Sequence, residues 1–209
     1  MTDLSAIVLN GTLKRTDSDD GRHSSTDVLC NQVADALRGH LVDVAPTVRV
    51  VDLNILPGVT SDEGPGDDWP DLRRRILDAD ILVVGTPIWL GQPSSVIKRV
   101  LERMDAFLGE TDDDGRMVSA DRVAVVAVVG NEDGAHHVSA ELFQALVDVG
   151  FTIPAGGVTY WVGEAMHGVD YRDVDPTPEP TAQATATLAA HAAHLAAALK
   201  DNGYPSPPD

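Results

Sequence analysis

Apolar residues along the chain fall into two patterns. Short continuous runs predict strands within residues 5–10, 47–53, 80–85, 122–130 and 151–161. Segments with apolar residues every three or four positions predict helices over 26–39, 70–79, 94–107, 134–150 and 180–200. Because strands that alternate with helices pair as a parallel sheet, these patterns predict an α/β fold: an open, doubly wound, five-stranded parallel sheet with helices on both faces.

The predicted elements follow one another without a linker. Residues 1–203 are therefore predicted to form a single domain, which at this length can bury a substantial core. The remaining segment, 204–209, contains three of the 13 prolines and is expected to be a disordered tail.

Composition narrows the classes of function. The net charge of −18 argues against binding to nucleic acid or to an anionic membrane, since both need basic patches. Many aspartates and few lysines are typical of a halophilic protein or of a GC-rich genome, and the sequence leaves both hypotheses open. The start of the chain lacks the basic region of a signal peptide, and the single cysteine, Cys30, fits a reducing compartment. We therefore expect a cytoplasmic protein.

The loop after the first strand carries hydroxyl residues at both ends. Ligands of doubly wound sheets bind at the carboxyl ends of the strands, and a helix N-terminus there favours an anion. The alternative is that the serines and threonine before the helix only cap it. Acidic residues in the middle of the loop, among them Asp17, Asp19 and Asp20, would repel a phosphate, so this part is expected to point outward. The candidate anion ligands are Thr12, Ser24, Ser25 and Thr26.

The loop after the third strand is apolar and contains one of the three tryptophans. An apolar loop at this edge can form a wall for a planar ring, while its backbone meets the polar edge of the ring. The alternative is that Trp89 lies in an interface between proteins. The candidate ring-binding residues here are Pro87, Ile88, Trp89, Leu90 and Gly91.

The loop after the fourth strand brings acids and histidines together. His136 and His137 invite a metal site, but neighbouring residues on a helix diverge by about 100°, and no HxxxH or CxxC partner accompanies them. We therefore expect no metal. The histidines either begin a polar helix or place one side chain near a ligand.

No arrangement of nucleophile and base stands out in the sequence. Cys30 lies on a helix beside Val33 and Ala34, so it is interpreted as core filler rather than as a nucleophile. No catalytic side chain is therefore predicted, as is typical of enzymes in which a cofactor carries the chemistry.

Three segments together resemble one family. They are NGT…SST, TPIWLGQPSSVIKRVLERMD (86–105) and VVGNEDGAHHV, and with the elements between them they cover residues 5–161. The chain thereby resembles the NADPH-dependent FMN reductase-like branch of the flavodoxin-like superfamily. The resemblance implies strand order 2-1-3-4-5 and bound FMN, with the phosphate on the first loop and the ring against the other two. By position, it also implies ring contacts in the loop after the fourth strand, at Asn131, Glu132, Asp133, Gly134 and His136. The first loop is longer and more acidic than is usual in the family.

The resemblance also implies an activity. NAD(P)H would reduce FMN, and a quinone, a flavin or another small oxidant would then take the electrons. The alternative is a flavodoxin-type electron carrier that docks to a redox partner protein, and a weaker one is an interaction module without cofactor. Relatives of this kind imply a homo-oligomer, a dimer or a tetramer.

Overall fold

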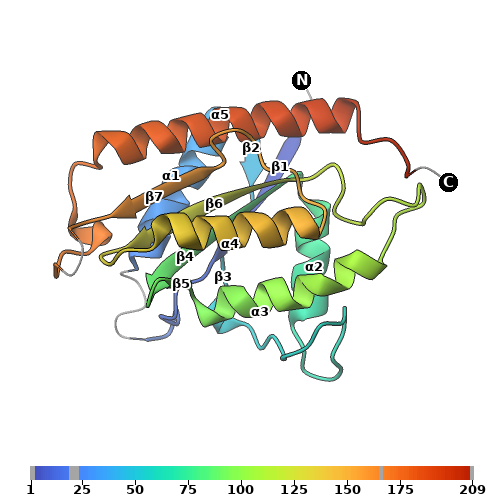
Figure 1. Ribbon diagram of the computed structural model, residues 1–209, viewed down its shortest axis with the longest axis horizontal. Helices are drawn as coiled ribbons and strands as arrows, with labels where there is room; N and C mark the ends of the chain where they lie inside the picture. The colour runs from blue at the N-terminus through green and yellow to red at the C-terminus, as the bar shows by residue number, and fades with distance from the viewer. Residues whose placement is uncertain (1–2, 19–23, 165–166, 208–209) are drawn as a thin grey trace.

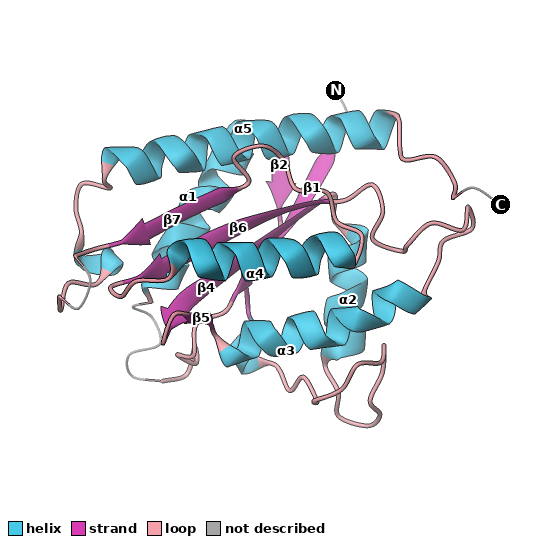
Figure 2. Ribbon diagram, in the orientation of Figure 1, coloured by secondary structure: helices cyan, strands magenta, loops and turns pink. Residues whose placement is uncertain are grey.

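A parallel sheet between two layers of helices forms the protein (Figures 1 and 2). The computed structural model describes residues 3–18, 24–164 and 167–207. Within them the main strands run in the order β2-β1-β4-β6-β7, β3 pairs with β1, and β5 pairs with β4. The strands are β1 (Leu4–Asn10), β2 (Val42–Val44), β3 (Val48–Arg49), β4 (Ile81–Trp89), β5 (Gln92–Pro93), β6 (Val123–Gly130) and β7 (Val158–Val162).

This arrangement confirms the predicted flavodoxin-like fold, in which the first strand lies between the second and the third. All pairs in the main sheet are parallel. The second predicted strand, 47–53, is wrong in extent. Pairing with β1 starts earlier, in β2, and resumes in β3, after which Val50–Asp52 forms the short 3-10 helix η1. Pro46 lies between the two pieces, and proline cannot donate to a strand ladder.

The third predicted strand is longer than expected. β4 continues from Ile81 to Trp89, so part of the predicted apolar loop is strand. It then reverses through Leu90 and Gly91, whose φ angles are 53° and 73°, and Trp89 pairs with Gln92 in β5. A two-residue turn of this kind needs positive φ at both positions, which glycine adopts without strain.

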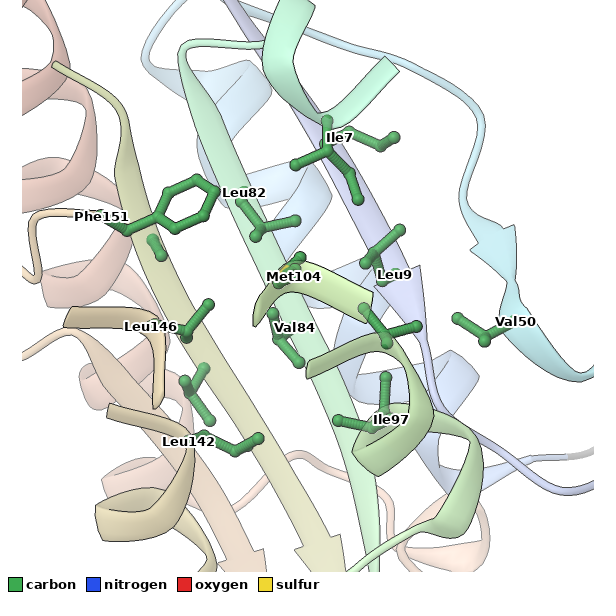
Figure 3. Packing of buried hydrophobic residues seen from close by; sticks show 14 of the residues in the cluster. Ile7, Leu9, Val50, Leu82, Val84, Ile97, Met104, Leu142, Leu146 and Phe151 are labelled. Carbon is green, nitrogen blue, oxygen red and sulfur yellow. The ribbon is translucent and has the colours of Figure 1, made fainter. Parts of the chain in front are cut away.

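Helices cover each face of the sheet with a separate apolar layer. Residues alternate between the layers along a strand: Ile7 and Leu9 of β1 pack in one, Ala6 and Val8 in the other. Figure 3 shows the first layer, where α3 and α4 side chains meet the sheet. It is covered by α2 (Trp69–Asp78), α3 (Ser95–Met104) and α4 (Ala135–Asp148), and the second layer by α1 (Ser25–Gly39) and α5 (Glu179–Asp201). Two further 3-10 helices are η2 (Asp105–Gly109) and η3 (Tyr171–Asp173).

A fully buried ion pair fixes the long connection between η1 and α2. The Arg103 guanidinium on α3 lies 2.7 Å from the Asp67 carboxylate, and both side chains are 0% exposed. Arg103 also donates to the carbonyls of Leu56 and Thr60, at 2.8–3.0 Å. Burial raises the pKa of Asp67, but hydrogen bonds from Arg103 and from backbone N–H groups outweigh it and hold that pKa below its usual value.

Contacts with the folded domain continue to Tyr204, one residue beyond the predicted end of the domain. Tyr204, expected to begin the disordered tail, donates its N–H to Asp121 at 2.7 Å, and its hydroxyl lies 3.0 Å from that of Thr152. Arg116 donates to its carbonyl at 3.0 Å. Residues 208–209 lie outside the described residues.

The buried pair should carry far more stability than an exposed one. We expect Asp67→Ala to lower the free energy of unfolding by about 3 kcal/mol, because Arg103 is left buried without its carboxylate. Asp71→Ala, which breaks an exposed contact with Arg74, should cost less than about 0.5 kcal/mol. Urea unfolding of both variants measures the difference, and equal losses would contradict the assignment.

The same pair predicts a dependence on pH. A carboxyl whose pKa is lowered by folding stabilises the protein fully above its unfolded pKa and loses that contribution as pH falls through the folded one. The difference in free energy of unfolding between wild type and Asp67→Ala should therefore be constant from pH 7 to about pH 5. It should shrink below about pH 4.

Candidate functional site

A cavity of about 220 Å³ lies at the carboxyl ends of β1, β4 and β6, where the sequence places the ligand. The three predicted loops and the segment after β7 form it. Its lining residues are Thr12, Leu13, Lys14, Ser24, Ser25, Thr26, Pro87, Ile88, Trp89, Val129, Gly130, Asn131, Glu132, Trp161, Asp170 and Tyr171.

One end of the cavity is polar and is built on the N-terminus of α1. Ser24 is the N-cap, and its hydroxyl accepts from the Asp27 N–H at 3.4 Å. The first bond inside the helix runs from Val28 N–H to the Ser24 carbonyl, so the N–H groups of Ser25 and Thr26 precede the helical ladder. The buried Thr12 hydroxyl accepts from Lys14 N–H at 3.3 Å and keeps its own proton to donate. This end therefore offers several hydrogen-bond donors.

A second layer of polar residues supports that end. The Asp27 carboxylate accepts hydrogen bonds from the side chains of Asn10 and Arg49. Arg49 also donates to the Lys14 carbonyl at 2.9 Å, which attaches the loop after β1 to the first turn of α1. Burial raises the pKa of Asp27 above its usual value, although Arg49 opposes the shift. Arg49 was missed in the sequence because it lies inside a predicted strand, where no local pattern marks it.

The other end of the cavity is apolar and aromatic. Ile88 is buried, while Trp89 is 54% exposed at the rim. Gly130 allows the strands to approach here: a Cβ on it would lie 3.0 Å from the Ile88 side chain. Trp161 contributes a further ring, which packs on the Tyr171 ring with 5.2 Å between the ring centroids. This end can therefore hold a planar apolar group.

The segment after β7 closes the cavity against α1. Tyr171 is buried, and its hydroxyl donates to Gln32 at 2.6 Å. The Arg172 N–H donates to the Ser25 hydroxyl at 3.3 Å, and Asn131 donates to Asp170 at 3.4 Å. No local sequence pattern predicts a role for this segment, because the contacts that fix it join residues far apart in the chain.

The predicted site residues divide into two groups. Those that line the cavity are Thr12, Ser24, Ser25, Thr26, Pro87, Ile88, Trp89, Asn131 and Glu132. Those that do not are Leu90, Gly91, Asp133, Gly134 and His136. The Nε2 atom of His136 instead lies 3.1 Å from the Tyr160 hydroxyl oxygen. The two rings meet edge-on, with 5.3 Å between their centroids. Of the acids expected to point outward, Asp19 and Asp20 lie outside the described residues.

In the described part of the chain, no group of three or more His, Cys, Asp or Glu residues could hold a metal ion. Cys30 is fully buried, and burial together with the nearby Asp27 raises the pKa of its thiol, which agrees with its predicted place in the core. None of the helices in the described ranges is long and apolar enough to span a bilayer.

Two curated proteins are similar to this chain. A protein of Mycobacterium bovis (strain ATCC BAA-935 / AF2122/97) named divalent metal cation transporter MntH is 40% identical over 174 residues, 81% of this chain. The chain spans only 25% of that protein. The 8-demethyl-8-aminoriboflavin-5′-phosphate synthase of Streptomyces davaonensis (strain DSM 101723 / JCM 4913 / KCC S-0913 / 768) is 29% identical over 211 residues, which cover 96% of this chain and 80% of the synthase.

A solved structure resembles the whole fold. RosB with the bound intermediate 8-demethyl-8-formylriboflavin-5′-phosphate superposes with a TM-score of 0.86 at 29% identity, covering 96% of this chain and 82% of RosB. The model of one protein family, NADPH-dependent FMN reductase, matches residues 5–167. The family match confirms the resemblance that the sequence predicted. The chain belongs to the NADPH-dependent FMN reductase family.

Proposed function

We propose that the protein binds FMN in this cavity and passes electrons from NAD(P)H to a small oxidant such as a quinone or a free flavin. One observation carries the proposal: a single cavity joins a helix N-terminus lined with hydroxyl groups to an apolar, aromatic wall. These two ends match the phosphate and the ring of a flavin phosphate.

The polar end fits a phosphate chemically. The N–H groups that precede the helical ladder and the dipole of a 15-residue helix both favour an anion at Ser25 and Thr26. Thr12 adds a hydroxyl donor from the opposite loop, and Lys14 adds a positive charge to the lining. Asp170 also lines the cavity, but its carboxylate is paired with the Arg172 guanidinium at 3.3 Å, which reduces its repulsion of a phosphate.

The apolar end fits the ring. Ile88, Trp89 and Trp161 would cover its faces and exclude water, while Asn131 offers a side-chain amide to its polar edge. Bound FMN supplies the hydride and electron transfer. The chain's own residues hold and orient the cofactor, and none of those that line the cavity is needed as a nucleophile. The partial exposure of Trp89 leaves a side from which a second molecule can approach.

A second candidate function is chemical modification of the flavin itself. The names of the Streptomyces davaonensis synthase and of the RosB complex both describe changes at position 8 of a riboflavin phosphate. At 29% identity over 96% of this chain, that similarity supports a flavin as substrate, held by the same phosphate end. Cation transport receives no such support, because the chain matches only a quarter of the protein that carries that name.

The electron-carrier alternative differs from both in its redox chemistry. A carrier that moves one electron at a time should accumulate a semiquinone during stepwise reduction, whereas a hydride-accepting reductase need not. The acids of this chain are spread along the sequence rather than gathered in one segment that would dock a basic partner.

The proposal predicts two spectroscopic changes. FMN titrated into the purified protein should shift its visible absorbance with saturation, and NADPH or NADH added without oxygen should then bleach the bound flavin. A quinone added afterwards should restore the colour. Saturable binding without bleaching by either nucleotide would contradict the reductase and favour the carrier.

Two serine variants separate capping from phosphate binding. Ser25→Ala should weaken FMN about tenfold and leave riboflavin unchanged, because a hydrogen bond to a charged group is worth about 1.5 kcal/mol. Ser24→Ala should also lower the free energy of unfolding by about 1 kcal/mol in the absence of flavin, since Ser24 is the N-cap of α1. Calorimetric titration and urea unfolding measure the two effects. If neither variant distinguishes FMN from riboflavin, the serines serve only as caps.

The flavin recovered after turnover decides between the two candidate functions. Under reductase chemistry, mass spectrometry of the released flavin should show unchanged FMN after many cycles with NAD(P)H and a quinone. A flavin of altered mass, formed only with active protein, would instead establish the second candidate.

A further inference from the structure

The tip of the β4–β5 hairpin holds Leu90 in a conformation that leucine does not favour. Leu90 has a φ of 53°, a left-handed conformation that is rare for leucine, and its side chain is 91% exposed. Neither backbone preference nor burial therefore stabilises Leu90 in this turn. Strained residues persist where the surrounding structure holds them, so the contacts of the tip indicate what fixes it.

The loop between β6 and α4 holds the tip. The Glu132 carboxylate accepts a hydrogen bond from the Leu90 N–H at 2.8 Å. Gly134 lies so close that a Cβ on it would be 2.9 Å from the Gly91 Cα, and Figure 1 shows β5 beside the N-terminal end of α4. On the return strand, Gln92 and His137 approach within 2.9 Å through their side-chain nitrogens. The tip and this loop are thus packed against each other.

Glu132 connects this contact to the cavity. Both Glu132 and Trp89 line the cavity, and Trp89 directly precedes Leu90 in the hairpin. A shift of the tip would therefore move Trp89 at the apolar end, while the polar end, which belongs to α1 and the loop after β1, would stay in place. Leu90, Gly91 and Gly134, predicted as ligand contacts, lie outside the cavity but support the wall that Trp89 forms.

We propose that Glu132 is a positioning residue: its carboxylate holds the Leu90 amide and thereby sets Trp89 against the ring end of the cavity. The part of this inference that concerns the flavin ring rests on the proposed function. The part that concerns the hairpin does not, because the contact exists without a ligand.

Three variants test the inference. Glu132→Ala removes the acceptor, Glu132→Gln keeps an amide oxygen that can accept from Leu90, and Glu102→Ala removes an exposed acid on α3 as a control for charge. The Leu90 amide exchange rate, measured by NMR without ligand, reports on the hairpin. Dissociation constants for FMN and riboflavin report on the two ends of the cavity.

We expect Leu90 exchange to become at least about tenfold faster in Glu132→Ala, because a charge-assisted hydrogen bond is lost. The dissociation constants for FMN and riboflavin should both rise about tenfold, so that their ratio stays the same, as only the ring end is disturbed. In Glu132→Gln, the Leu90 exchange rate and both dissociation constants should stay within about threefold of the wild-type values. In Glu102→Ala, all three should equal the wild-type values.

An unchanged Leu90 exchange rate in Glu132→Ala would overturn the inference. A loss of affinity for FMN without a loss of affinity for riboflavin would overturn it too. If wild type binds neither flavin, the proposed function fails, and Leu90 exchange alone decides whether Glu132 holds the hairpin. Should Glu132→Ala not fold, Gly134→Ala replaces it, since its Cβ would displace Gly91 from the same loop. Equal weakening of both flavins in that variant would support the inference, and unequal weakening would overturn it.

Discussion

The close approach of the backbone at the carboxyl end of β1 to the middle of β4 determines where the cavity forms. The Gly11 N–H donates to the Gly85 carbonyl at 2.7 Å. A Cβ on Gly11 would lie 2.8 Å from that oxygen, and one on Gly85 would lie 2.2 Å from the Cys30 sulfur. Side chains at these positions would therefore separate the strands from each other and from α1. Because both are glycine, the hydroxyl-lined loop after β1 and the apolar end of β4 meet in one space.

The cavity shows how a chain of net charge −18 can offer a site for an anion. Distant charges are screened within about 8 Å at physiological ionic strength, so the groups in contact with a ligand dominate. At the polar end of the cavity these are the N-terminus of α1 and Lys14, and there Arg49 and Arg172 compensate the carboxylates of Asp27 and Asp170. The predicted homo-oligomer and the halophilic origin of the acidity remain predictions.

Sequence reasoning located the cavity because the order of strands and helices determines which loops converge. Once the sheet was predicted to be parallel, the loops after β1, β4 and β6 had to meet at one edge. Contacts that depend on distant partners could not be predicted this way. Arg49 and Tyr171 reach α1 from elsewhere in the chain, and no local spacing marks either one. The sequence also could not show that Leu90 lies outside the cavity. That depends on the hairpin, whose tip contacts the loop after β6 rather than the cavity.

A crystal structure of the protein with FMN would show directly whether this cavity is the flavin site. We expect the phosphate at the N-terminus of α1, within hydrogen-bond distance of Ser25 and Thr26, and the ring beside Ile88, Trp89 and Trp161. A flavin bound elsewhere, or one whose phosphate lies away from α1, would show that the proposed site is wrong.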